Sequence, residues 1–104
     1  MRGGGAIVEL RLYVAGSNLL SQRALDNLRA ILDRTPPGTY GLEVVDLVAE
    51  PERADEHRIL ATPTLVRLSP APVRKLIGDL SDTDGVRRHL GIPSDPALPQ
   101  EGTD

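Results

Sequence analysis

A proline interrupts the apolar run at residues 59–66, and this break constrains the fold more than any other feature of the sequence. Proline cannot donate to a β-sheet ladder, and it restricts the preceding residue to an extended backbone. A helix over residues 53–60 must therefore end here, and a strand can begin at Thr64. Because X-Pro bonds can be cis at modest cost, the Thr62-Pro63 bond is also a candidate for slow exchange between two arrangements.

The composition indicates a single small domain without thiol chemistry. The chain has 104 residues, of which 39% are hydrophobic, and it contains no Phe, Trp or Cys. Its core must therefore consist of Leu, Val, Ile and Ala, and disulfides, thiolate metal sites and thiol catalysis are excluded. The formal net charge is −3, with basic residues scattered among carboxylates. Nucleic acid is therefore not an expected partner.

Both ends of the chain differ in composition from the middle. Residues 1–5 are glycine-rich and predict a flexible arm, not a phosphate-binding loop, because no Lys-Ser/Thr pair follows. Residues 6–92 form the predicted domain. Residues 93–104 carry prolines and carboxylates with few apolar side chains, which predicts a disordered tail. Neither a signal peptide nor a membrane-spanning segment is apparent, so we expect a cytoplasmic protein that does not bind membranes.

Hydrophobic periodicity predicts a strand, a helix and a second strand in the first half. Apolar residues alternate over residues 7–14 and then recur at three- and four-residue spacing over 20–32, after a turn at residues 15–18 in which Ser17 and Asn18 supply helix-capping oxygens. Two prolines and a glycine at 36–38 end this helix. Residues 40–48 are apolar at consecutive positions, as expected for a parallel strand that is covered on both faces.

The second half predicts a helix, a hairpin and a last helix. Pro51 suits the first turn of a helix that continues to about residue 60. Residues 64–68 and 73–77 are predicted to be antiparallel strands, joined by a turn with two prolines. Ser81 or Asp82 can cap a final helix that reaches Ile92, although Gly85 weakens it by about 1 kcal/mol relative to alanine.

This order of elements predicts an α/β protein with a thioredoxin-like fold. Redox members of that fold place a Cys-x-x-Cys pair at the start of the first helix, where the helix dipole lowers the thiol pKa. The corresponding segment here is Gly16-Ser17-Asn18-Leu19. A thioredoxin-like protein with this sequence cannot perform thiol chemistry.

Several short motifs carry a more specific resemblance. They are Leu12-Tyr13-Val14-Ala15-Gly16, Ser21 with Arg23-Ala24-Leu25, Val45-Asp46-Leu47, Ile59-Leu60-Ala61-Thr62-Pro63-Thr64-Leu65, and Pro72-Val73-Arg74-Lys75 with Ile77-Gly78-Asp79-Leu80-Ser81. Together they resemble the KaiB family of circadian clock proteins, from about residue 8 to residue 90.

The resemblance implies a non-enzymatic regulator without a cofactor. It would bind a KaiC-type ATPase ring through a thioredoxin-like form and modulate the phosphorylation and ATPase cycle in circadian or timer-like signalling. KaiA or a related histidine kinase output pathway would be a further partner. The implied partner-binding surface runs from the second strand into the second helix, with rim charges on other elements. Its residues are Arg23, Gly41, Glu43, Glu50, Arg58, Arg67 and Arg74.

The resemblance also implies a second fold for the same chain. In this ground form, often a tetramer, the segment after Pro63 becomes helical and the C-terminal segment becomes a strand. The implied fold-switch residues are Thr62, Pro63, Pro70, Pro72, Gly78 and Asp79. Gly85, Gly91 and Pro93 are poorly suited to such a strand, so we expect the thioredoxin-like form to be appreciably populated without a partner. A homodimer or a homotetramer is compatible with the sequence.

Other interpretations of these residues are open. Pro63 can be an ordinary strand-entry proline, and the arginines can be solvated surface charges. His57 and His89 have no neighbouring Cys or third His, so no metal site is predicted. Glu52, Asp55 and Glu56 fit a charged helix face better than an acid-base pair. The alternative function is a redox-inactive thioredoxin-like module for ligand binding, such as glutathione, or for stress-response interactions.

Overall fold

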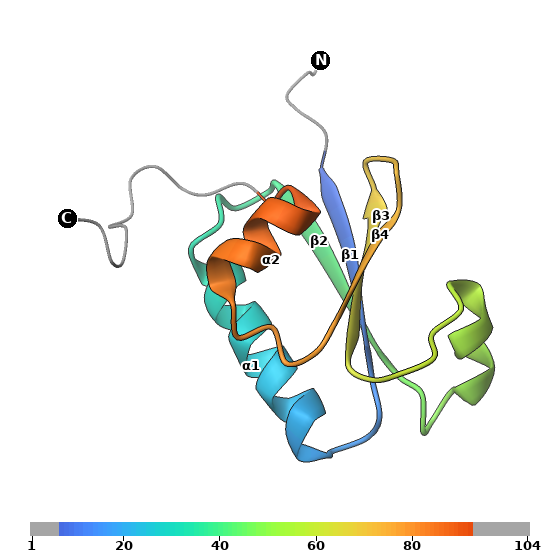
Figure 1. Cartoon of the computed structure of the whole chain (residues 1–104). Helices are drawn as coiled ribbons and strands as arrows, with labels where there is room; N and C mark the ends of the chain where they lie inside the picture. Colours follow the sequence, from blue (N-terminus) through green and yellow to red (C-terminus); the bar gives the residue numbers. More distant parts are fainter. Residues whose placement is uncertain (1–6, 93–104) are drawn as a thin grey trace.

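A four-stranded sheet with the order β2-β1-β3-β4 organises the molecule (Figure 1). The computed structural model describes residues 7–92, so the predicted arm and tail lie outside the described residues. The strands are β1 (Val8–Val14), β2 (Tyr40–Asp46), β3 (Thr64–Ser69) and β4 (Arg74–Ile77). β1 is parallel to β2 and antiparallel to β3, and β3 and β4 form an antiparallel pair. The predicted strand-helix-strand unit and the predicted hairpin are both confirmed.

The helix α1 (Leu19–Asp33) connects β1 to β2 and lies on the same side of the sheet as α2 (Thr83–Leu90) (Figure 1). Its N-cap is Asn18, within the segment predicted to supply the cap, and Asn18 Oδ1 accepts a hydrogen bond of 2.8 Å from the backbone N–H of Ser21. This bond satisfies one of the N–H groups that a helix start leaves unpaired. The buried side of α1 then faces the sheet through Leu28 and Ile31.

The main core lies between the sheet and the two helices. Its buried residues are Val8, Leu10, Leu12, Val14, Ala24, Leu28, Ile31, Leu32, Leu65, Leu80, Val86, Leu90 and Ile92. All are aliphatic, as the composition predicts, and each fully buried Leu contributes about 1.5–3 kcal/mol relative to exposure. The alternate residues of β1 that the sequence places on one face supply the centre of this core.

A smaller core covers the other face of the sheet. It consists of Tyr13, Val45, Ile59 and Val66, and the 3₁₀-helix η1 (Pro51–Glu56) lies on this side (Figure 1). The prediction of a helix that continues to residue 60 is wrong. η1 ends at Glu56. Arg58, whose φ of 53° is left-handed, then turns the chain, and Ile59 N–H donates to Ala54 O at 2.8 Å.

The edge position of β2 contradicts the expectation that it is covered on both faces. Only Val45 is buried in this strand, and Val44 is 43% exposed. The strand also ends at Asp46, two residues before the predicted boundary. Here the backbone N–H groups of Ala49 and Glu50 turn back to Asp46 O, at 3.1 and 2.9 Å.

The last helix, α2, is shorter than predicted and depends on glycine at both ends. The Asp82 side chain caps it by accepting a hydrogen bond of 3.1 Å from Gly85 N–H, and a Cβ at Gly85 would collide with this carboxylate. Gly91 ends the helix in the left-handed conformation, with φ 65°. Arg87 connects α2 to α1, because its Nη2 donates to Ile31 O at 2.6 Å.

Candidate interaction surface

The backbone around Pro63 connects the start of β3 to the end of β4. The Thr62-Pro63 peptide bond is cis, and Pro63 O accepts a hydrogen bond of 3.0 Å from Gly78 N–H. Gly78 has a φ of 126°, which L-residues with a side chain rarely adopt. Three of the implied fold-switch residues are therefore neighbours in space.

The other implied fold-switch residues occupy separate places. Pro70 and Pro72 lie in the turn between β3 and β4, at the opposite end of the hairpin from Pro63. Asp79 follows β4, where its backbone O accepts a 2.7 Å hydrogen bond from Asn27 Nδ2 on α1. The structure thus distributes these residues over both ends of the hairpin.

The loop that would hold a thiol pair in a redox protein is connected to the end of β2. Asp46 Oδ1 accepts hydrogen bonds of 2.9 Å from the backbone N–H groups of both Gly16 and Val48. The Gly16 bond, followed by the Val48 bond, lowers the pKa of Asp46 below its usual value. The loop therefore meets a fixed carboxylate from the end of β2 and contains no thiol.

Exposed apolar side chains gather at the same end of the sheet. Leu19 follows β1, Val48 follows β2 and Leu60 precedes the antiparallel β3, so the topology places all three at one end. Leu60 is 94% exposed and Val48 is 70% exposed. Such exposed apolar positions are available for contact with another molecule.

A network of ion pairs joins the outer face of β2 to η1. Glu43 Oε1 accepts from Arg11 Nε at 2.8 Å, and Glu43 Oε2 accepts from Arg53 Nη1 at 2.9 Å. Arg53 Nε also donates to Glu56 Oε2 at 2.8 Å, and the Tyr13 hydroxyl donates to Glu56 Oε1 at the same distance. Arg53, followed by Arg11, lowers the pKa of Glu43. Arg53, followed by Tyr13, lowers the pKa of Glu56.

The structure brings most of the implied partner-binding residues of this region together. We call the area made by the exposed Glu43, Glu50 and Arg58 and the half-buried Gly41 and Arg53 the β2–η1 surface. Glu50 immediately precedes η1 and lies 3.8 Å from Arg53, measured from Glu50 Oε1 to Arg53 Nη1. Arg58 is exposed just after η1.

The three remaining arginines do not join this surface. Arg23 is exposed on α1, and Arg74 is exposed on β4 at the opposite edge of the sheet. The expectation that Arg67 is a solvated rim charge is wrong, because this residue is only 7% exposed. Its guanidinium instead donates to two backbone carbonyls, Leu90 O and Pro72 O.

Sequence reasoning missed Arg11, Arg53 and Glu56 as members of the ion-pair network. Arg11 and Glu43 are 32 positions apart in the sequence and meet because β1 and β2 pair in this register. Alternation along β1 places Arg11 and Tyr13 on one face, but it cannot identify Glu56 as their neighbour. The signal that was available is the single cation Arg53 among the carboxylates of residues 50–56, which must pair with some of them.

Two negative findings apply to residues 7–92. No helix in this range has both the length and the apolar character needed to cross a membrane. Within the same residues, no group of three or more His, Cys, Asp or Glu side chains is arranged to hold a metal ion.

The fold and this surface define a thioredoxin-like protein that lacks the cysteine pair. The N-terminal domain of SasA from Synechococcus elongatus has a similar structure, with a TM-score of 0.69 and 24% identity over 88% of this chain and 90% of that one. Mitochondrial thioredoxin 3 from Saccharomyces cerevisiae gives a TM-score of 0.67 and 16% identity, over 83% and 78% of the two chains. At these identities the likeness establishes the fold alone.

Sequence comparison then identifies the family. The KaiB domain model matches residues 11–92, and the chain belongs to the KaiB family. The circadian clock oscillator protein KaiB of Gloeothece citriformis is 52% identical over 92 residues, which cover 88% of this chain and 87% of the relative. The circadian clock oscillator protein KaiB1 of Synechocystis sp. is 46% identical over 95 residues, covering 91% and 90%.

Proposed function

We propose that this KaiB-family chain is a non-enzymatic regulator that binds a KaiC-type ATPase ring and modulates its ATPase and phosphorylation cycle. The form described above would be the binding form. The observation that carries this proposal is the β2–η1 surface, where an open strand edge lies beside an ordered set of charges. KaiA or a related histidine kinase output pathway would be a further partner.

The open edge of β2 supports a role in recognition. β2 pairs with β1 on one side only, so half of its backbone hydrogen-bonding groups face away from the sheet. Such an edge can receive an extended segment from a partner, in which main-chain hydrogen bonds supply affinity. Val44, which is exposed on the opposite face of this strand from Glu43, adds an apolar contact beside the edge.

The charges of the β2–η1 surface support specificity. Glu43 and Arg53 are held by mutual ion pairs, so their positions are fixed before a partner arrives. Glu50 and Arg58 are exposed before and after η1, and Glu50 is oriented by its 3.8 Å contact with Arg53, so both charges can meet complementary charges on a partner. Charges of this kind at a rim mainly change the association rate and the choice of partner.

Charge reversal at Glu50 and Arg58 tests the proposal. We expect Glu50→Lys and Arg58→Glu each to weaken binding to the KaiC-type ATPase ring by several fold, measured by biolayer interferometry. Arg29→Glu, on the exposed side of α1, is the matched control and should bind normally. Normal binding by both test variants, or an equal loss in the control, would place the interface elsewhere.

We further propose that the chain exchanges between this form and a ground form in which the segment after Pro63 is helical. The glycines of α2 favour the form described here. Gly85 admits the capping carboxylate of Asp82, and Gly91 adopts the left-handed conformation that ends the helix. In a strand, the same glycines would supply no side chain for packing.

Replacing Gly91 tests this proposal. A left-handed conformation costs an L-residue about 1–2 kcal/mol, so Gly91→Ala should move the population by roughly tenfold away from the form described here. Gly38→Ala imposes the same strain, at φ 81°, in the half of the chain that is not rebuilt, and is the control. NMR of the free protein would report both populations. An identical response to the two substitutions would contradict a rebuilt C-terminal half.

A further inference from the structure

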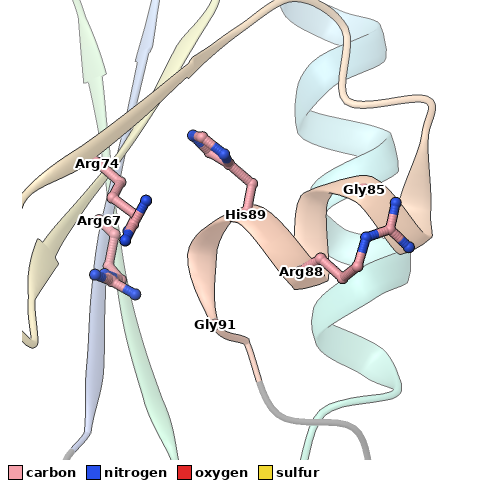
Figure 2. Close-up of a pocket in the computed structure, with 6 residues that line it drawn as sticks. All are labelled: Arg67, Arg74, Gly85, Arg88, His89 and Gly91. Atoms are coloured by element: carbon pink, nitrogen blue, oxygen red, sulfur yellow. The ribbon is translucent and has the colours of Figure 1, made fainter.

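A basic groove lies between the β3–β4 hairpin and α2, away from the β2–η1 surface (Figure 2). Its volume is about 490 Å³. The residues that line it are Arg67, Arg74, Gly85, Arg88, His89 and Gly91. These described lining residues include three arginines and a histidine but no Asp or Glu. The groove therefore concentrates positive charge.

Arg67 is the central residue of this groove because it is a buried cation without a buried anion. It is 7% exposed, its Nη1 donates to Leu90 O at 2.9 Å, and its Nη2 donates to Pro72 O at 2.8 Å. Both acceptors are neutral carbonyls. Its Nε is also buried and has no hydrogen-bond partner among residues 7–92. A buried charge in this state is unfavourable unless an anion compensates it.

A second guanidinium lies beside the first. Arg74 is opposite Arg67 in the register of β4 and β3, and Figure 2 shows the two side chains next to each other on the sheet side of the groove. His89 extends from α2 toward the same space, whereas Arg88 is directed away from the two arginines. No ion pair of Arg67 or Arg74 occurs within the described part of the chain.

The backbone of Gly91 helps to keep this site open. A Cβ at Gly91 would lie 3.1 Å from Arg67 Nη1, so a side chain here would press on the guanidinium. The Asp82 carboxylate approaches Gly85 at the far end of the groove, but it is engaged by the α2 backbone. The positive charge of the two arginines is therefore not neutralised from within.

We propose that this groove binds a small phosphate-bearing anion. The guanidinium fork of Arg74 matches the geometry of phosphate oxygens, and the N–H groups of Arg67 that do not donate to Leu90 O or Pro72 O can add further bonds to the same phosphate group. A volume of about 490 Å³ is larger than a single phosphate requires and is within the range of small-molecule sites. Inorganic phosphate and the phosphates of a nucleotide share this chemistry. The site is independent of the proposed binding to an ATPase ring.

NMR titration of the full chain tests the proposal. Sodium phosphate and ADP are added separately at constant ionic strength, and amide shifts are followed for the wild type, Arg74→Gln and the control Arg58→Gln. We expect saturable shifts at β4 and α2 in the wild type and the control, and affinity weaker by about tenfold or more in Arg74→Gln, because a charge-assisted hydrogen bond is lost. Arg74 and Arg58 are both exposed, so neither substitution should disturb the fold.

The two probes distinguish the source of the phosphate group. Equal affinities would support a site for the phosphate group alone, and tighter binding of ADP would support a nucleotide ligand. Absence of saturable shifts at the groove with both probes would overturn the proposal. An unchanged affinity in Arg74→Gln, or the same loss in Arg58→Gln, would also overturn it.

Discussion

Arg67 and Arg74 are cross-strand neighbours with opposite environments: Arg67 is buried against the end of α2, whereas Arg74 is exposed. Arg67 connects three elements, because its guanidinium bonds to Leu90 O at the end of α2 and to Pro72 O in the β3–β4 turn. The two arginines should therefore respond very differently to substitution.

We expect Arg67→Ala to lower the free energy of unfolding by about 2–4 kcal/mol, because two carbonyls lose their donor and each loss costs about 1–3 kcal/mol. Arg74→Ala should change it by no more than about 0.5 kcal/mol, as is usual for surface positions. Urea unfolding followed by circular dichroism measures both values. Similar losses in the two variants would contradict the assigned role of Arg67.

Asp46 makes stability dependent on pH. Hydrogen bonds from Gly16 and Val48 lower its pKa in the folded protein, so the unfolded state binds the proton more readily. The stabilisation is present above the unfolded pKa, which is about 4, and is lost as the pH falls through the folded pKa. Asp46→Asn should therefore be less stable at pH 7 and should lose less stability on acidification.

Measuring the free energy of unfolding of the wild type and Asp46→Asn between roughly pH 2 and pH 7 would test this dependence. Glu43 and Glu56 also have lowered pKa values, so they contribute to the same pH dependence. In Asp46→Asn the free energy of unfolding should therefore still fall on acidification, but less steeply than in the wild type. Asp26→Asn, on the exposed side of α1, is the matched control. If both variants follow the wild-type curve, the loop bonds of Asp46 do not stabilise the fold.

Tyr13 connects the smaller core to η1 through its hydroxyl. Burial raises the pKa of Tyr13, and its hydroxyl donates a hydrogen bond of 2.8 Å to Glu56 Oε1. Tyr13→Phe should lower the free energy of unfolding by about 1 kcal/mol and should increase amide hydrogen exchange in η1. Tyr40→Phe removes the other tyrosine hydroxyl and should leave η1 exchange unchanged. Equal exchange in both variants would show that the Tyr13–Glu56 bond does not hold η1.

The absence of cysteine predicts the outcome of redox assays. The purified chain should reduce insulin no faster than the buffer, because it contains no nucleophilic thiol. Calorimetry with glutathione should give no saturable heat. Saturable glutathione binding would favour the alternative of a redox-inactive ligand-binding module.

The sequence predicted the main core and most of the strands because these features depend on local periodicity. β1 alternates along its length, and α1 combines a three- and four-residue spacing with an Asn18 cap. The hairpin of β3 and β4 followed from apolar runs that are separated by prolines. Each of these signals lies within a short segment, the longest being the 15 residues of α1.

The errors arose where tertiary position decides the structure. Residues 53–60 have helical spacing, but the helix ends at Glu56. The chain then places Ile59 in the smaller core and leaves Leu60 exposed, and the spacing alone does not reveal this change of path. Likewise, consecutive apolar residues in β2 cannot reveal that this strand is at an edge. The burial of Arg67 depends on the end of α2, which lies 23 positions later in the sequence.

The two faces of the sheet differ greatly in how firmly they are covered. Among residues 7–92, the main core has thirteen buried residues, whereas the face under η1 has four, together with the bonds of Arg53 and Tyr13. Regions with few buried apolar contacts open locally at a lower free energy than the global unfolding. η1 is therefore expected to be its own unit of local opening. A molecule that binds the β2–η1 surface would then act on an equilibrium that leaves the rest of the domain folded.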